Sequence, residues 1–547
     1  MTLFLSCLLL AYFTHCSDVE SGDPFIQNKA PASFVGRTEC IECHQKEFNL
    51  WQSSHHDLAM QPANEKTVLG NFDNVQFIHK GVTSTFSKRN GKFLVRTEGP
   101  QGTLEEYPIT YTMGVDPLQQ YLIEFPKGRY QSLSLSWDTR PTDAGGQRWF
   151  HLYGEERIPH DDLLHWTGPY QTWNHMCAEC HSTDLKKNYL SREDRYQTTF
   201  SEMDIACEAC HGPGSQHVSW ARSVEQGDSF EYPDNLGLVL QLKDGQNVNW
   251  VFDDGAVIAR RSQPRQSTTE LDTCARCHSR RSVIHEPYQH GRPLLDTHLP
   301  SLLDEILYYP DGQVQDEVYV YGSFLQSKMY HQGVSCSDCH EPHSLKLRAS
   351  GDNVCTICHL PEKFQAKSHH FHPPTSSGGS CVECHMPATT YMEVDPRHDH
   401  SFRIPRPDLT IKIGTPNACT NCHSDRSPEW AAAAVIEWYG PDRSNSSHFG
   451  EVLQKGREGT SDAAADLVRL INDREQPAIV RASALRLLQG SVSRKTLPVI
   501  ESALSNPDPL LRVAALSTLP AIEPQGRLHL AGPLLQDPIR AVRTESA

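Results

Sequence analysis

One pentapeptide, Cys-x-x-Cys-His, occurs eight times in this 547-residue chain and constrains its fold more than any other feature. The cysteine pairs are Cys40 and Cys43, Cys177 and Cys180, Cys207 and Cys210, Cys274 and Cys277, Cys336 and Cys339, Cys355 and Cys358, Cys381 and Cys384, and Cys419 and Cys422. The histidines that follow them are His44, His181, His211, His278, His340, His359, His385 and His423. Two thiols at this spacing can bind the two vinyl groups of one porphyrin, and the next His can bind its iron. The pattern predicts eight covalent c-type haems with these histidines as proximal ligands.

Zinc sites and redox-active dithiols are the alternatives, because both also use Cys-x-x-Cys. One copy would leave them open, but a His in the same place in all eight copies favours haem. The motifs use 16 of the 18 cysteines, and the other two, Cys7 and Cys16, lie near the N-terminus. We therefore expect no disulfide or separate zinc site beyond the leader.

Residues 1–17 are predicted to be a signal peptide, because the apolar stretch at 3–13 is too short to span a bilayer. Cys16 is a candidate for lipidation, although no small residue precedes it. Since c-type haem is attached outside the cytoplasm in bacteria, we expect export to the periplasm or the extracellular face. No later segment has transmembrane length, so a membrane tether is expected only if Cys16 carries a lipid.

The net charge of −17 indicates which partners to expect. An acidic surface repels nucleic acid and anionic membranes, so neither is an expected partner. Redox proteins are the expected partners.

The first three motifs and their flanks carry a family resemblance. Trp51 is followed five residues later by His56 and then by Ala59 and Met60, while His217 follows the Gly-Pro-Gly run after the third motif. These stretches resemble the cytochrome c554 family of tetrahaem electron carriers. The resemblance implies that His56 and His217 are distal haem ligands.

The same resemblance singles out the second motif. The corresponding haem in that family lacks a strong distal ligand, which implies that an open haem, if there is one, is the one at His181. Arg157, His160 and His165 are near in sequence and are candidates to line its pocket. The stretch from residue 143 to 175 also resembles multihaem cytochromes that carry C-terminal helical repeats.

A small antiparallel sheet is predicted at residues 72–140, between the first two motifs. The Asn-Gly pair at 90–91 is a strong hairpin turn signal, and Lys127-Gly128 separates a second pair of strand-like runs. The aromatic residues of this insertion are expected to form its core.

The last four motifs fall within 88 residues, from Cys336 to His423, so their haems must supply the core of that segment. His343 lies three residues past His340, on the same side of the ring, and is expected to bind a neighbouring haem instead. Methionine is scarce, so bis-His ligation should dominate and give low reduction potentials. The remaining distal candidates are His175, His331, His372 and His400, and other histidines, such as His369 and His370, lie beside them.

The C-terminal segment repeats with a period of 31 residues. Val480-Arg481 is followed by Leu511-Arg512 and then by Val542-Arg543, each pair within an apolar run. This period, with Pro or Asp leading each helix, resembles HEAT-like helical repeats. The alternative is a set of ordinary amphipathic helices.

The expected fold is a mainly α multihaem cytochrome with a small antiparallel β insertion and a C-terminal α-helical HEAT-like repeat segment. The expected domains are a signal peptide at 1–17, a cytochrome c554-like haem domain at 30–300 with the β insertion at about 72–140, a second four-haem segment at 301–427, and helical repeats at 428–547.

Three functions compete on the sequence. In the first, the haems conduct electrons and the repeats dock a redox partner. In the second, one haem with an open coordination position acts on a small nitrogen or sulfur compound, as a multihaem oxidoreductase. In the third, the repeats carry the function and the haems supply structure or sensing. The sequence favours electron transfer.

Overall fold

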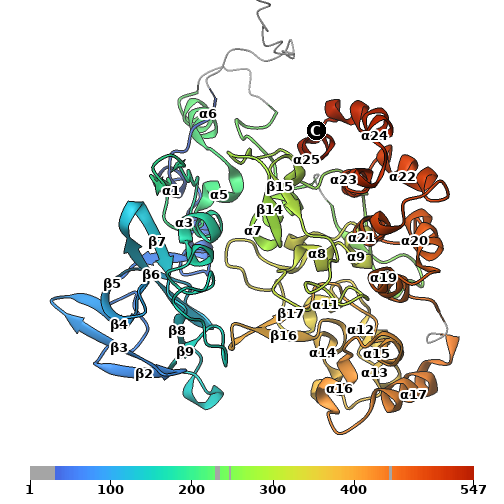
Figure 1. Cartoon of the computed structure of the whole chain (residues 1–547), viewed down its shortest axis with the longest axis horizontal. Helices are drawn as coiled ribbons and strands as arrows, with labels where there is room; N and C mark the ends of the chain where they lie inside the picture. Colours follow the sequence, from blue (N-terminus) through green and yellow to red (C-terminus); the bar gives the residue numbers. More distant parts are fainter. Residues whose placement is uncertain (1–30, 228–233, 245–247, 443–445) are drawn as a thin grey trace, which may run out of the picture.

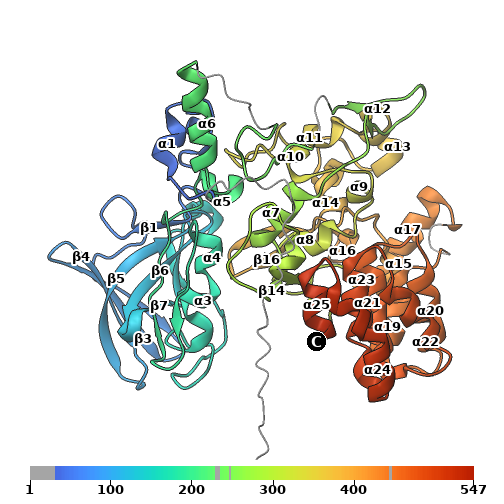
Figure 2. The ribbon, with the colours of Figure 1, turned by 90° about the horizontal axis from the view of Figure 1, so that it is seen from above.

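The computed structural model describes residues 31–227, 234–244, 248–442 and 446–547. The predicted signal peptide, with Cys7 and Cys16, lies outside the described residues. Strands gather at one end of the molecule (blue), helices α19–α25 gather at the other (red), and α7 and α8 lie between them (Figures 1 and 2). No helix in the described part is long and apolar enough to cross a membrane.

The sheet at the blue end has nine strands in the described chain, all paired antiparallel. Seven of them follow the order β2-β3-β4-β5-β6-β8-β9, while β1 pairs with β5 and β7 pairs with β6. Asn90 and Gly91 have positive φ angles between Arg89 and Lys92, as the predicted turn requires. The strands are β1 (Met60–Pro62), β2 (Val75–His79), β3 (Val82–Arg89), β4 (Lys92–Glu98), β5 (Leu104–Met113), β6 (Leu118–Phe125), β7 (Arg129–Ser132), β8 (Leu135–Asp138) and β9 (Arg148–His151).

The two ends of this sheet return to each other, so that it forms a nearly closed antiparallel barrel. The ring of His79 on β2 stacks on the ring of His151 on β9, with their centres 4.0 Å apart. Inside the barrel, the buried Phe72 ring meets the edges of Phe86, Phe93, Tyr121 and Trp149 at 5.1 to 5.7 Å. Such edge-to-face packing gives the barrel an aromatic core of its own.

The barrel overturns the expected fold class: the chain is mixed α/β, not mainly α with a small β insertion. The turn signals marked only the middle strands. The short strands β1 and β9 lie outside the predicted range and complete the sheet, β1 by pairing with β5 and β9 by pairing with β8. The pairing of β1 with β5 joins distant parts of the sequence, which leaves little trace in local sequence. The C-terminal half of the chain is helical, as the sequence predicted.

Each motif lies on or at the end of a short helix, and these helices occupy the middle of the chain. The motif helices are α1 (Arg37–Ile41), α4 (Ala178–His181), α5 (Cys207–His211), α7 (Thr269–His278), α10 (Cys336–Cys339), α11 (Asn353–Thr356), α14 (Cys381–His385) and α16 (Ala418–Cys422). Other short helices connect them, namely α2 (Gln45–Trp51), α3 (Trp173–Met176), α6 (Ser215–Glu225), α8 (Tyr321–Phe324), α9 (Lys328–His331), α12 (Pro361–Phe364), α13 (Lys367–His370) and α15 (Pro407–Ile413).

Four small antiparallel hairpins lie between these helices. They are formed by β10 (Tyr189–Leu190) with β11 (Arg195–Tyr196), β12 (Trp250–Val251) with β13 (Arg260–Arg261), β14 (Arg281–Val283) with β15 (His298–Pro300), and β16 (Ala388–Tyr391) with β17 (Asp395–His398).

The C-terminal helices stack side by side, as expected for a helical array. Those that carry the 31-residue repeat, α21, α23 and α25, pack in that order. Their assignment to HEAT-like repeats stays a prediction. The helices are α17 (Pro428–Tyr439), α19 (Phe449–Glu458), α20 (Ala463–Asn472), α21 (Ala478–Leu488), α22 (Leu497–Leu504), α23 (Pro509–Leu516), α24 (Pro524–Ala531) and α25 (Arg540–Ser546).

These helices share one hydrophobic core with the middle of the chain. Leu303 and Tyr308 are buried in the same cluster as Leu485 and Leu511. The Leu303 N–H also donates to the Ser483 hydroxyl at 3.0 Å. The array is therefore packed onto the central segment and is not attached by a linker alone.

A buried ion pair joins α23 to the turn before α25. Both guanidinium contacts of Arg512 with the Asp537 carboxylate are short, 2.8 and 3.0 Å, and both side chains are buried. Asp537→Ala should lower the thermal midpoint of helix unfolding, because an unpaired buried guanidinium costs about 3–5 kcal/mol. Far-ultraviolet circular dichroism gives the midpoint. Glu523→Ala, which removes an exposed carboxylate nearby, is the control; equal midpoints for the two variants would contradict the account.

Candidate haem-binding centres

All sixteen motif cysteines are free thiols, and most are partly buried. The exceptions are Cys43 in the first motif and Cys422 in the last, which are exposed. In the part of the chain that the structure describes, no three His, Cys, Asp or Glu side chains converge on one point as ligands of a bare metal ion would.

Six of the eight motif histidines face a second histidine from elsewhere in the chain. The ring centres of all six pairs lie 6.1 to 6.5 Å apart. The pairs are His44 with His217 (6.1 Å), His278 with His56 (6.2 Å), His211 with His343 (6.4 Å), His340 with His400 (6.5 Å), His385 with His369 (6.1 Å) and His423 with His372 (6.1 Å).

This separation fits one iron between two imidazoles. An imidazole nitrogen binds a first-row transition metal at about 2 Å, and its ring centre lies about 1 Å behind the nitrogen, so two opposed ligands have ring centres about 6 Å apart. Rings in direct contact are much closer, as the 4.0 Å between His79 and His151 illustrates. The six pairs therefore fit a haem iron with two axial histidines.

Hydrogen bonds hold several of the facing imidazoles by their Nδ1 atoms. An Nδ1–H that donates to a carbonyl leaves the Nε2 lone pair free for a metal and fixes the plane of the ring. The contacts are His217 with the Leu236 carbonyl at 2.8 Å, His400 with the His398 carbonyl at 2.9 Å, His385 with the Arg403 carbonyl at 2.5 Å, and His372 with the His370 carbonyl.

Burial also favours the neutral, metal-binding form of these rings. Burial and the neighbouring His278 lower the pKa of His56 to about 4. Burial and the facing His343 lower the pKa of His211 likewise to about 4. A neutral imidazole has a free lone pair at neutral pH, which iron ligation requires.

His181 and His359 are different, because within the described residues neither faces a second histidine ring across such a gap. The Nδ1 of His181 contacts the Ala59 carbonyl at 2.9 Å, which orients the ring in the same way as those of the paired histidines. Burial lowers the pKa of His181. The ring of His359 meets the edge of Phe364 at 5.2 Å.

The distal candidates from the sequence divide into two groups. His56, His217, His343, His372 and His400 each lie opposite a motif histidine, and His343 faces a motif other than the one beside it, as the geometry of the chain suggested.

His175 and His331 are exposed and face no motif histidine in the described chain. His369 takes a place that the sequence did not assign, opposite His385. It lies in a run with His370 and His372, and sequence spacing alone does not tell which of the three faces a motif.

The candidates for a pocket near the second motif lie against the barrel. Arg157 forms an ion pair with Glu98 at 2.8 Å, and His165 contacts the Thr167 hydroxyl at 2.8 Å. His160 lies beside Gly102, in the turn after β4.

Comparison with known proteins agrees with this geometry at the motifs. The family model "Cytochrome c554 and c-prime" matches residues 39–80 and 164–212, which contain the first three motifs and His56. A segment of 110 residues is 27% identical to the multihaem cytochrome MtrA of Shewanella baltica (strain OS185), covering 19% of this chain and 29% of MtrA. The chain thus spans less than a third of that relative.

A solved structure, that of the outer cell wall cytochrome OcwA, aligns with 90% of this chain and all of its own at a TM-score of 0.47 and 17% identity. At that score the likeness carries no argument about function. Two segments of the chain are thus similar to the cytochrome c554 and c-prime family, and its eight motifs with their facing histidines are those of a multihaem c-type cytochrome.

Proposed function

We propose that this chain binds eight c-type haems and transfers electrons along them, with bis-His ligation at most of the irons. The observation that carries the proposal is the set of six histidine pairs at one common separation. Bound haem supplies one-electron exchange between Fe(II) and Fe(III). The histidines occupy both axial positions, so such sites favour electron exchange over substrate binding.

The expected setting follows from the motifs and the charge. The chain acts outside the cytoplasm, on the periplasmic or extracellular face of a bacterium, and exchanges electrons with redox protein partners. The stacked helices α19–α25 are the proposed docking surface for one of these partners.

A second function rests on the two motif histidines that face no other histidine. A haem held by His181 or His359 alone keeps one axial position for a small molecule. The c554-type segment favours His181, which lies beside the apolar cluster of Met60, Leu122 and Trp173. The alternative is thus a multihaem oxidoreductase that acts on a small nitrogen or sulfur compound at His181.

The haem count is tested by intact mass. Every motif has both thiols and the His, so the purified, acid-extracted protein should exceed the mass of the processed apoprotein by eight haems. A reproducible count of six or fewer would contradict the proposal.

The distal ligands are tested with neighbouring histidines in one short helix. His369→Ala should convert one low-spin haem to high-spin, because His385 would lose the ring that faces it. His370→Ala is the matched control, since the His370 Nε2 contacts the Gln365 carbonyl instead. Electron paramagnetic resonance gives the spin states, and mass spectrometry checks that both variants keep all their haems. A high-spin signal in the His370 variant alone would show that the pairing is assigned to the wrong histidine.

A further inference from the structure

The fourth motif lies on an unusually long motif helix. Helix α7 has ten residues, whereas α4, α5 and α10 have four, five and four. It packs against both α4 and α10, which carry the second and fifth motifs. A helix of this length has enough surface for several neighbours.

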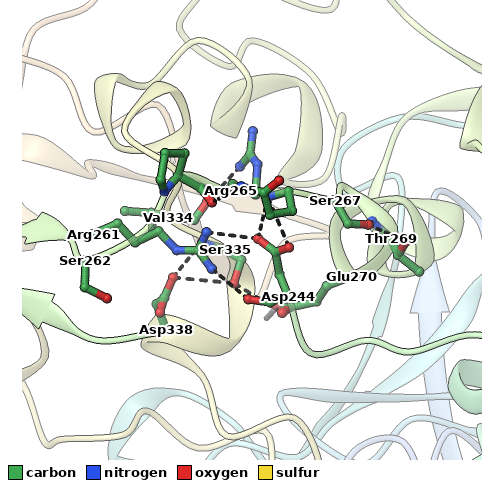
Figure 3. A network of polar contacts seen from close by, with 12 residues as sticks. Asp244, Arg261, Ser262, Arg265, Ser267, Thr269, Glu270, Val334, Ser335 and Asp338 are labelled. Atoms are coloured by element: carbon green, nitrogen blue, oxygen red, sulfur yellow. Dashed lines mark hydrogen bonds and ion pairs between the residues drawn. The ribbon is translucent and has the colours of Figure 1, made fainter. Parts of the chain in front are cut away.

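The contact between the fourth and fifth motifs is a network of polar side chains (Figure 3). The Glu270 carboxylate on α7 accepts from the Ser337 backbone N–H at 2.7 Å and from the Ser337 hydroxyl at 2.8 Å. The Ser335 hydroxyl donates to the same carboxylate at 3.2 Å.

The second motif meets the fourth through both sulfur and charge. The Cys180 sulfur lies 4.0 Å from the Cys277 carbonyl oxygen. Glu179, between the two cysteines of the second motif, forms an ion pair with Arg281 at 3.0 Å and approaches Arg276 of the fourth motif to 3.6 Å. His298 from β15 contacts the same carboxylate at 2.9 Å.

The third motif reaches the fourth on another side. The Arg276 guanidinium of the fourth motif lies 4.3 Å from the centre of the Tyr288 ring, which meets the His290 ring at 4.9 Å. The His290 Nε2 in turn contacts the carbonyl of Ala209 in the third motif at 3.2 Å.

The first motif is attached to the third. Helix α1 packs against α5. Glu208, within the third motif, accepts from the backbone N–H of Gly36 at 2.8 Å, just before α1.

The fifth to eighth motifs continue in sequence order. Only fifteen residues separate Cys339 of the fifth motif from Cys355 of the sixth. Asp352, just before the sixth motif, accepts from the Cys381 N–H of the seventh at 3.1 Å. Helix α14 of the seventh packs on α16 of the eighth.

We propose that the haem of the fourth motif is a three-way junction for electron transfer. One arm runs from it through the third motif to the first, and another runs through the fifth motif to the eighth. The second motif alone forms the third arm. Haem attachment turns each thiol into a thioether, so contacts between motif helices mark where neighbouring haems would approach. The two long arms end at Cys43 and Cys422, the exposed cysteines, where partners can reach the chain. At every transfer one Fe(II) becomes Fe(III) and one Fe(III) becomes Fe(II), with no bond made or broken. The proposal rests on the haem loading that the proposed function requires.

A cryo-electron microscopy map of the loaded full-length protein tests the order directly. The haem at Cys274 and Cys277 should approach three others, those of the second, third and fifth motifs. A second-motif haem that approaches any haem more closely than the fourth would overturn the junction. Fewer than eight haems in the map would instead count against the proposed function.

Matched deletions test the same order in solution. Lys46→Cys, at the exposed start of α2 just after the first motif, carries a photosensitiser. His372→Met marks the haem of the eighth motif with a raised potential and a distinct spectrum. With this pair in place, Cys177→Ser with Cys180→Ser should leave electron arrival at the eighth motif unchanged. Cys274→Ser with Cys277→Ser should abolish it, with loss of one haem by mass in each.

The proposal would be overturned if electrons still reached the eighth motif without the fourth haem, or if they no longer reached it without the second. If the fourth-motif variant does not fold, the second-motif variant alone still tests the proposal. A haem that lies outside the path from the first motif to the eighth must be dispensable for electron transfer between them.

Discussion

The architecture depends on pairs of imidazoles that face each other at a separation into which one iron fits. Six times, a histidine that directly follows two cysteines is opposed by another from elsewhere in the chain, with ring centres 6.1 to 6.5 Å apart. With haem bound, each such pair would fix two segments relative to one iron, as a cross-link does. Short motif helices with little apolar surface can be held in this way, since the haems would supply the core that side chains do not.

The barrel and the helical array need no such support. The barrel is filled by aromatic rings, and the array shares its core with residues 295–325. The two bodies flank the motif helices, with α7 and α8 between them (Figures 1 and 2). A large share of the chain therefore serves to hold the motifs in place. Among the motif helices, α7 contacts more than one neighbour.

The haem-attachment motifs are readable from sequence, because thioether attachment needs three residues within five positions; covalent attachment at all eight motifs stays a prediction. The Asn90-Gly91 turn was readable for the same reason, since its signal is local. The fold class was predicted wrongly, because the sheet is completed by pairing between strands that are distant in sequence, such as β1 with β5.

Distal ligation is also a long-range property. His56 lies twelve residues after His44 yet faces His278, and His343 follows His340 yet faces His211. The resemblance to the cytochrome c554 family supplied His56 and His217. Only the fold separates His369 from His370.

Near-infrared magnetic circular dichroism of the fully loaded protein tests the central claim most directly, because it counts haems by their axial ligands. Six bis-His haems are predicted, one for each facing pair, together with two haems of another ligation at His181 and His359. Bis-His ligation at fewer than six haems, or at all eight, would contradict the account.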